Sequence, residues 1–258
     1  MLVLRSFSVL LAFWIVLLSS CQPPEPTESS LIERLTEHQG KHLLDRTHVS
    51  FNFRDKHFEV WRYDGLFRYS RGFADSTGRV LEVLDNSGVY RYENGNLVEQ
   101  VEKRRNSIET DVNSVVYFAL LPYQLTDPAV IPKYLGRTTV DGVSYETLEV
   151  TFMQANGGRD YEDRFVYWIH PEDDTIDYLA YFYHTDGGGS RFRKAVNRRR
   201  VGGVLFADYL NYRAEPDSIG SNVHLFSSLF NEGAVELVSE VILDSLRVEV
   251  PDSMPKVP

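Results

Sequence analysis

Cysteine is almost absent from this chain of 258 residues, in which Cys21 is the only one. A single cysteine cannot form a disulfide within its own chain, and it cannot supply the paired thiolates of a zinc site. The folded part of the protein therefore has to be stabilised by its hydrophobic core, for which 15 Tyr and 15 Phe residues supply ample apolar surface.

An excess of basic residues is absent as well. The chain has 27 Lys and Arg against 37 Asp and Glu, which gives a formal net charge of −10 at pH 7. Proteins that bind nucleic acid use basic surfaces to neutralise the backbone phosphates. We therefore predict that nucleic acid is not a partner.

The motifs of several common catalytic sites are also missing. The sequence has no His-Glu-x-x-His pair, no Gly-x-Ser-x-Gly elbow and no glycine-rich loop followed by Lys-Ser or Lys-Thr. His38 and His42 are four residues apart, but Gly40 lies between them, where a helix is expected to end. We predict no metal and no cofactor, and a non-catalytic protein is favoured over an enzyme.

The start of the chain has the layout of a secretory signal. Arg5 supplies the positive charge, residues 9–18 form an apolar run too short to span a bilayer, and Leu18-Ser19-Ser20-Cys21 ends it. This ending resembles the bacterial lipobox, which implies that residues 1–20 are a signal peptide removed just before Cys21. The alternative is an N-terminal anchor that is not cut.

The lipobox resemblance also implies that Cys21 is acylated, with a diacylglycerol on its thiol and an N-acyl group. Several acyl chains together hold a protein firmly to a membrane. Gln22 follows the cysteine where an Asp would be the inner-membrane retention signal. We therefore expect an anchor in the outer membrane, with the protein facing the periplasm or the cell surface.

The ends of the mature chain have the composition of flexible segments. Residues 21–29 contain three prolines and two glutamates, and residues 251–258 contain three prolines. We predict a tether over 21–29, a single β-rich domain over 30–250 and a disordered tail over 251–258.

The hydrophobic pattern predicts many short strands and few helices. Ser30 and Glu33 have the spacing of a capping box, so a first helix is expected from Ser30 to Gly40. Further helices are expected at 111–121, before Pro122, and at 222–231. A Pro-rich connection is expected around 127–132. The expected strands are 49–53, 58–60, 66–72, 79–84, 88–93, 96–101, 143–154, 161–170, 175–184, 190–200, 203–213 and 235–250.

This order of elements contains no parallel strand-helix-strand rhythm and no repeat period. About a dozen antiparallel strands with two or three short helices indicate a mainly β (α+β) fold. We predict a strongly curved antiparallel sheet or half-barrel, wrapped around the hydrophobic helix at 112–121.

Two glycine-rich connections carry most of the polar residues that could form a site. Antiparallel strands with one hairpin between them bring these connections to the same end of the sheet. The predicted rim of a ligand site consists of Asp160, Asp163, His184, Asp186, Arg191 and Arg193. The alternative is that these residues form local charge pairs and turns at the ends of strands.

Aromatic residues next to this rim are candidates for the wall of an apolar cavity. The predicted lining consists of Phe118, Tyr167, Trp168, Tyr181 and Phe182. Because neighbouring residues of a strand point to opposite faces, about half of the aromatic residues in this region are expected to fill the core instead.

Short aromatic and apolar segments between residues 117 and 212 resemble a known family. These segments are YFALLPY at 117–123, LTDP at 125–128, YLG at 134–136, DYED at 160–163, YWI at 167–169, YLAY at 178–181 and NY at 211–212. They resemble an uncharacterised family of Bacteroidota lipoproteins, the domain-of-unknown-function family 6503, over about residues 30–250. That family implies a compartment and a class but no reaction.

The order of elements resembles a second group, the lipoprotein-carrier fold of outer-membrane lipoprotein-sorting proteins. In that fold the concave face of the sheet holds acyl chains, so the resemblance implies a lipid or other apolar ligand. One alternative is a hydrolase or carbohydrate-acting enzyme that uses the rim carboxylates and His184. Another is a structural or assembly partner of an envelope protein whose identity the sequence does not give.

Overall fold

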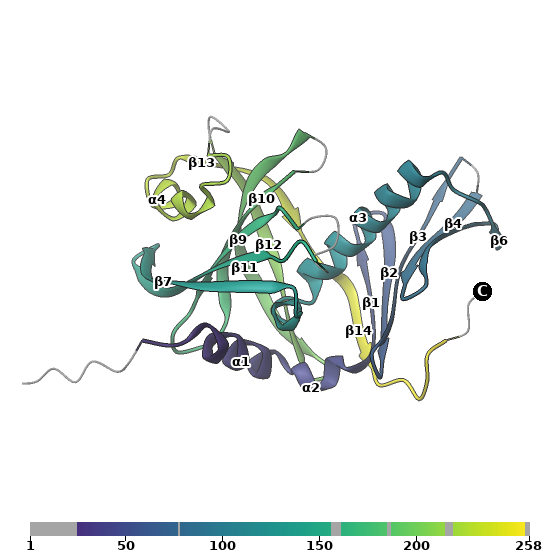
Figure 1. Cartoon of the computed structure of the whole chain (residues 1–258), viewed down its shortest axis with the longest axis horizontal. Helices are drawn as coiled ribbons and strands as arrows, with labels where there is room; N and C mark the ends of the chain where they lie inside the picture. Colours follow the sequence, from purple (N-terminus) through teal and green to yellow (C-terminus); the bar gives the residue numbers. More distant parts are fainter. Residues whose placement is uncertain (1–24, 77, 156–160, 185–186, 215–218, 256–258) are drawn as a thin grey trace, which may run out of the picture.

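The computed structural model describes residues 25–76, 78–155, 161–184, 187–214 and 219–255 (Figure 1). The predicted mainly β fold with antiparallel strands and short helices is confirmed. The described strands are divided between two sheets of seven strands each, and neither of these sheets closes into a barrel.

The first sheet, which we name sheet A, contains the six N-terminal strands and the last strand of the chain. Across the sheet they are β14 (Asp244–Glu249), β1 (Arg46–Phe53), β2 (Lys56–Tyr63), β3 (Leu66–Asp75), β4 (Gly78–Asp85), β5 (Gly88–Glu93) and β6 (Asn96–Leu97). Asp64-Gly65 and Asn94-Gly95 form tight turns in which all four residues have positive φ. Such turns match the right-handed twist of the strands they join, so these hairpins form as predicted.

The second sheet, sheet B, contains most of the C-terminal half. Its strands are, in order across the sheet, β13 (Val235–Val241), β12 (Val204–Ala214), β11 (Gly189–Val201), β10 (Ile176–Tyr183), β9 (Arg164–Ile169), β8 (Val143–Phe152) and β7 (Val130–Val140). The Pro-rich connection expected at 127–132 was wrong in part, because β7 begins within it. Pro132 pairs with Val150 on this edge strand, where one side of the backbone needs no hydrogen-bond partner.

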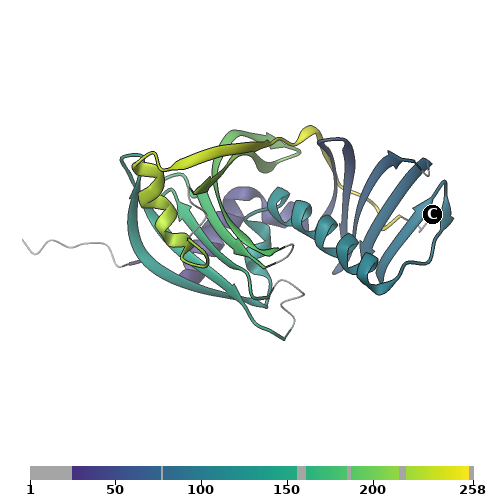
Figure 2. The ribbon, with the colours of Figure 1, turned by 90° about the horizontal axis from the view of Figure 1, so that it is seen from above.

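The predicted last strand, 235–250, is two strands that belong to different sheets. β13 pairs with β12 of sheet B, and β14 pairs with β1 of sheet A. Leu243 lies between them and is buried. Its N–H donates to Asp208 Oδ1 at 2.9 Å, and its carbonyl accepts from Arg199 Nη2 at 2.5 Å. These bonds fix the crossing from one sheet to the other, which Figure 2 shows in yellow-green.

The first two helices lie one after the other along the lower edge of the molecule in the view of Figure 1. α1 (Glu28–Gln39) begins after Thr27, whose Oγ1 accepts the N–H of Ser30 at 3.2 Å, so the cap is Thr27 and not Ser30 as predicted. The helix ends as predicted at Gly40, with φ of 100°. α2 (Lys41–Leu44) follows directly.

Helix α3 (Glu102–Ala119) is longer than predicted, and it extends from sheet A to sheet B (Figure 1). The prediction started at Asp111 because the preceding residues are polar. Two ion pairs with sheet A explain why the polar half is helical: Arg104 donates to Glu82 at 2.7 Å, and Asp111 accepts from Arg71 at 2.8 Å. Ile108, Val112 and Val116 are buried beside them in one hydrophobic cluster.

The outer face of sheet B is also covered. Two short helical turns, η3 (Val223–Leu225) and α4 (Phe226–Asn231), lie where the helix at 222–231 was expected. Phe226 packs there with Trp168 and Phe192, and all three are fully buried. Both faces of this sheet therefore pack against other parts of the chain, and the inner face forms the site described below.

The C-terminal segment contacts sheet A. Arg68 donates to the carbonyl of Pro255 at 2.8 Å, so the described part of the expected tail is held at this point. None of the helices in the described ranges is long and apolar enough to cross a membrane.

Candidate functional site

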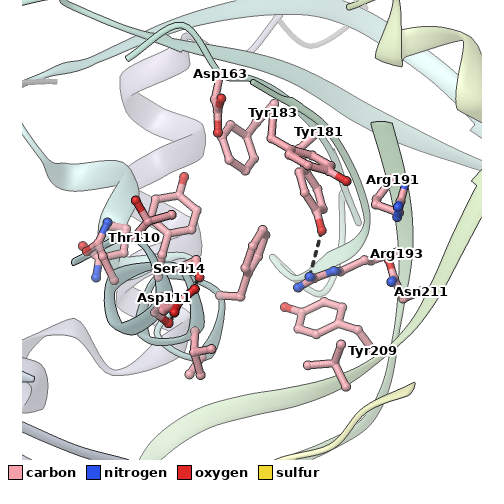
Figure 3. A pocket seen from close by; sticks show the side chains of 18 of the residues that line it. Thr110, Asp111, Ser114, Asp163, Tyr181, Tyr183, Arg191, Arg193, Tyr209 and Asn211 are labelled. Atoms are coloured by element: carbon pink, nitrogen blue, oxygen red, sulfur yellow. Dashed lines mark hydrogen bonds between the residues drawn. The ribbon is translucent and has the colours of Figure 1, made fainter. Parts of the chain in front are cut away.

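A cavity of about 540 Å³ lies between helix α3 and the inner face of sheet B (Figure 3). The turn between β1 and β2 and the strand β13 complete its wall. Eight aromatic side chains line it, namely Phe53, Tyr117, Phe118, Phe152, Phe165, Tyr181, Tyr183 and Tyr209. Strand alternation explains the set, because Phe165, Tyr181 and Tyr209 occupy positions of neighbouring strands that point to the same face.

The aromatic rings of this wall pack against one another. The ring centroids of Phe118 and Tyr181 are 5.0 Å apart, those of Phe165 and Tyr181 are 5.6 Å apart, and those of Tyr117 and Phe165 are 5.4 Å apart. Such spacings are typical of stabilising aromatic pairs. These rings therefore form a firm apolar part of the wall, and polar side chains line much of the rest.

Three buried tyrosine hydroxyls in and behind the wall, those of Tyr117, Tyr167 and Tyr209, stay neutral. The hydroxyl oxygens of Tyr117 and Tyr167 are 2.9 Å apart, and burial raises the pKa of both groups. Burial also raises the pKa of Tyr209 to about 12, although the positive charge of Arg193 acts in the opposite direction. These three groups add hydrogen-bonding capacity to the site but no charge at neutral pH.

Arg193 is the buried charge of the cavity. Its side chain is on β11, with only 8% of the residue exposed. Nη2 donates to the hydroxyl of Tyr181 at 2.9 Å, a bond drawn as a dashed line in Figure 3, and Cζ lies 3.8 Å from the centroid of the Phe118 ring. This distance is typical of a cation–π contact.

Three of the six residues predicted for the rim line the cavity, and they are Asp163, Arg191 and Arg193. His184 lies beside them, exposed, with Nδ1 at 3.6 Å from Asp163 Oδ1, but it does not belong to the cavity wall. Asp160 and Asp186 lie outside the described residues, as does Cys21.

The five residues predicted to line the cavity divide between the two faces of sheet B. Phe118 and Tyr181 are in the wall, and Tyr167 lies directly behind it against Tyr117. Trp168 and Phe182 pack in the cluster under α4 on the opposite face, so their assignment to the cavity is corrected. Trp168 follows the inward-facing Tyr167, and Phe182 follows the inward-facing Tyr181. Because side chains alternate along a strand, both residues point to the outer face.

Several residues of the wall were not predicted. Tyr183, Tyr209 and Asn211 line the cavity, and Asn211 is the register partner of Arg193 on the adjacent strand. Two signals in the sequence point to them: Tyr183 has the same parity as Tyr181, and Asn211 has the same parity as Tyr209. Using those signals requires knowing which face of the sheet is the inner one.

The described ranges contain no group of three or more His, Cys, Asp or Glu side chains arranged to hold a metal ion. Three of the four acidic residues in the described cavity wall, all but Glu109, accept hydrogen bonds from other groups. Asp111 accepts from Arg71 at 2.8 Å, Asp127 accepts the N–H of Ala129 at 2.8 Å, and Asp163 accepts the N–H of His184 at 3.3 Å. The site therefore combines a cluster of aromatic rings, a polar remainder of the wall and one buried cation, Arg193.

Comparison with known proteins gives one family and several related folds. The sequence matches over residues 7–242 the model of a family described as a family of unknown function, DUF6503. No curated protein matches the chain.

Among solved structures, a LolA superfamily protein from Nitrosomonas europaea is similar with a TM-score of 0.51 at 11% identity, covering 89% of this chain and 96% of that one. A domain assigned to an outer-membrane lipoprotein-sorting protein from Vibrio parahaemolyticus has a TM-score of 0.44 at 8% identity. The match covers 86% of this chain and 94% of that one. The lipoprotein LppX from Mycobacterium tuberculosis has a TM-score of 0.29 at 9% identity, covering 63% and 91%. We base the fold assignment on the first of these, since the other two have TM-scores below 0.5. At such low identity the likeness establishes the fold and not the ligand.

Proposed function

The chain belongs to DUF6503, a family of unknown function, and we propose that it is a lipid-anchored envelope protein that binds an apolar or lipid ligand without catalysis. The observation that carries this proposal is the cavity of about 540 Å³ with its wall of aromatic rings. Ligand pockets of proteins have about this volume and a mainly apolar lining with a few polar groups. The LolA-like fold supports the same reading.

The proposed anchor is the acyl group on Cys21, and the proposed site of action is the periplasmic or outer face of the outer membrane. The lipobox-like ending of the apolar segment, with Gln22 after the cysteine, supports this placement. An anchored domain meets lipids and envelope proteins at the membrane surface, which fits a ligand of low solubility.

The ligand-binding proposal is tested with the full chain carrying Cys21→Ser, which has no acyl group to occupy the cavity. We expect the uncharged probe 1-N-phenylnaphthylamine to bind with a saturable rise in fluorescence. Ala207 lines the cavity on β12, so Ala207→Trp places an indole ring in that space and should weaken probe binding by about tenfold or more.

Leu210→Trp is the matched control. It adds the same ring on the same strand, but Leu210 has the opposite parity and is not part of the cavity wall. We expect this variant to bind the probe as the parent does. A folded Ala207→Trp protein with unchanged probe affinity, or a parent that does not bind the probe, would contradict the proposal.

The anchor is tested by cell fractionation. The unmodified chain should sediment with membranes, and the Cys21→Ser variant should be exported and recovered in the soluble fraction, because it loses all acyl chains at once. If the variant remains with membranes through a high-salt and alkaline wash, the acyl group is not the main attachment.

A further inference from the structure

The guanidinium of Arg193 lacks most of its hydrogen-bond partners although it is buried. Its Nε and Nη1 atoms have essentially no exposed surface and no partner, and together they carry three of the five N–H donors of a guanidinium. Nη2 donates to the hydroxyl of Tyr181. A buried charge without a counter-ion is costly, and a ligand that supplied the missing acceptors would offset that cost.

No carboxylate of the described wall compensates this charge. Asp111, Asp127 and Asp163 of the wall accept from Arg71, from Ala129 N–H and from His184 N–H, as described above, and Glu109, the fourth acidic residue of the described wall, forms no ion pair with Arg193. The protein supports Arg193 instead through two rings, with Cζ at 3.8 Å from the Phe118 centroid and 5.1 Å from the Tyr181 centroid. Ring contacts hold a cation in position but do not accept its N–H bonds.

The position of Arg193 in the cavity suits the polar end of an elongated ligand. Figure 3 shows Arg193 among Tyr181, Arg191, Tyr209 and Asn211 on the sheet side, with α3 facing them. Arg191 lines the same cavity, and its Nη1 donates to the carbonyl of Ser190 at 2.7 Å. The matching partner of the Arg193 guanidinium is a group that carries negative charge and oxygen acceptors.

We propose that Arg193 binds the anionic end of an amphiphilic ligand, a carboxylate or a phosphate ester, while the apolar part of that ligand packs against the aromatic wall. This inference rests on the proposed function, because it assigns the chemical class of the ligand in the same cavity. Arginine binds both kinds of oxyanion through charge-assisted hydrogen bonds.

Displacement of 1-N-phenylnaphthylamine from the Cys21→Ser chain tests the proposal. The competitors share one alkyl chain and differ at the head: dodecanoate, dodecyl phosphate, dodecanol and dodecyltrimethylammonium, each below the concentration at which it forms micelles. We expect the anions to compete at concentrations about tenfold or more lower than the alcohol, as for a hydrogen bond to a charged group. Whether dodecanoate or dodecyl phosphate competes better identifies the carboxylate or the phosphate as the head.

Arg193→Met should remove the preference for the anions over the alcohol, because methionine fills similar volume without charge. Arg198→Met is the matched control, since Arg198 is on the same strand but pairs with Asp177 away from the cavity. Removing an uncompensated buried charge should leave the melting temperature unchanged or higher. Dodecanoate should raise the melting temperature of the parent and of Arg198→Met, but not that of Arg193→Met.

The outcomes separate this inference from the proposed function. If the parent binds neither probe nor alcohol, the proposed function fails. If it binds both and shows no preference for the anions, only the assignment of Arg193 fails. The parent chain alone is enough to show this result. A preference that persists in folded Arg193→Met would likewise overturn the assignment.

Discussion

Replacing Glu82 with alanine is expected to lower the free energy of unfolding by about 3–5 kcal/mol, the largest effect of any single charged residue in sheet A. Glu82 is fully buried on β4. Its carboxylate accepts from Arg71 Nε at 2.5 Å, from Arg91 Nη1 at 2.7 Å and from Arg104 Nη2 at 2.7 Å. Without this carboxylate, three guanidinium groups lose a shared counter-ion, and Arg71 and Arg91 are themselves mostly buried.

Urea unfolding followed by circular dichroism measures this effect. Arg34→Ala is the matched control, because it removes one partner of an ion pair of similar length on the surface, Arg34 to Asp174 at 2.9 Å, at a helical position that accepts alanine. Exposed pairs contribute about 0–1 kcal/mol. If Glu82→Ala costs no more than Arg34→Ala, the three arginines do not depend on the buried carboxylate.

Replacing Trp168 with alanine is expected to cost about 3–5 kcal/mol of folding free energy and to leave probe affinity unchanged. Trp168 is fully buried on the outer face of sheet B, and its ring centroid is 5.6 Å from that of Phe192. The loss comes from a void under α4, and the cavity wall on the inner face keeps all its residues.

Phe118→Ala is the counterpart on the inner face. Phe118 is only half-buried and contacts Arg193 and Tyr181. Its removal should therefore cost less folding free energy than Trp168→Ala and lower the affinity for the probe more. Circular dichroism gives the folded fraction, and probe affinity is calculated for that fraction. A Trp168→Ala protein that is folded but binds the probe less tightly would contradict the assignment of Trp168 to the outer face.

Local chemistry made much of the fold predictable. Asp64-Gly65 and Asn94-Gly95 identify hairpins because the turn itself needs residues that tolerate positive φ. Gly40 ends α1 for the same reason. These features depend on residues close in sequence, so the sequence is sufficient to place them.

The features that the sequence did not reveal depend on distant partners. The polar half of α3 is stable because Arg104 meets a glutamate 22 positions away in sequence. The division of 235–250 into β13 and β14 depends on Asp208, which is 35 positions from Leu243. Neither interaction leaves a local pattern.

The sequence identified many residues near the candidate site but not the face of sheet B on which each one lies. Arg193, Phe118 and Tyr181 were all identified, but so were Trp168 and Phe182 on the other face. When only one face of a sheet is buried, hydrophobicity identifies it. Here α4 covers the outer face as well, so aromatic residues of both parities are buried and composition does not separate them.

Helix α3 has a further consequence for how the molecule tolerates change. Positions 104, 111 and 118 are spaced by seven residues, close to two helical turns, and therefore share one stripe of the helix. Along that stripe Arg104 and Asp111 meet the charges of sheet A, while Phe118 meets Arg193 of sheet B. The ion pairs of Arg104 and Asp111 thus fix how the helix is rotated about its axis. That rotation in turn points Phe118 toward Arg193 in the cavity. Inserting or deleting one residue between Asp111 and Phe118 would turn the ring by about 100° around the helix axis and away from the guanidinium. The spacing within α3, and not only its composition, is therefore part of the site.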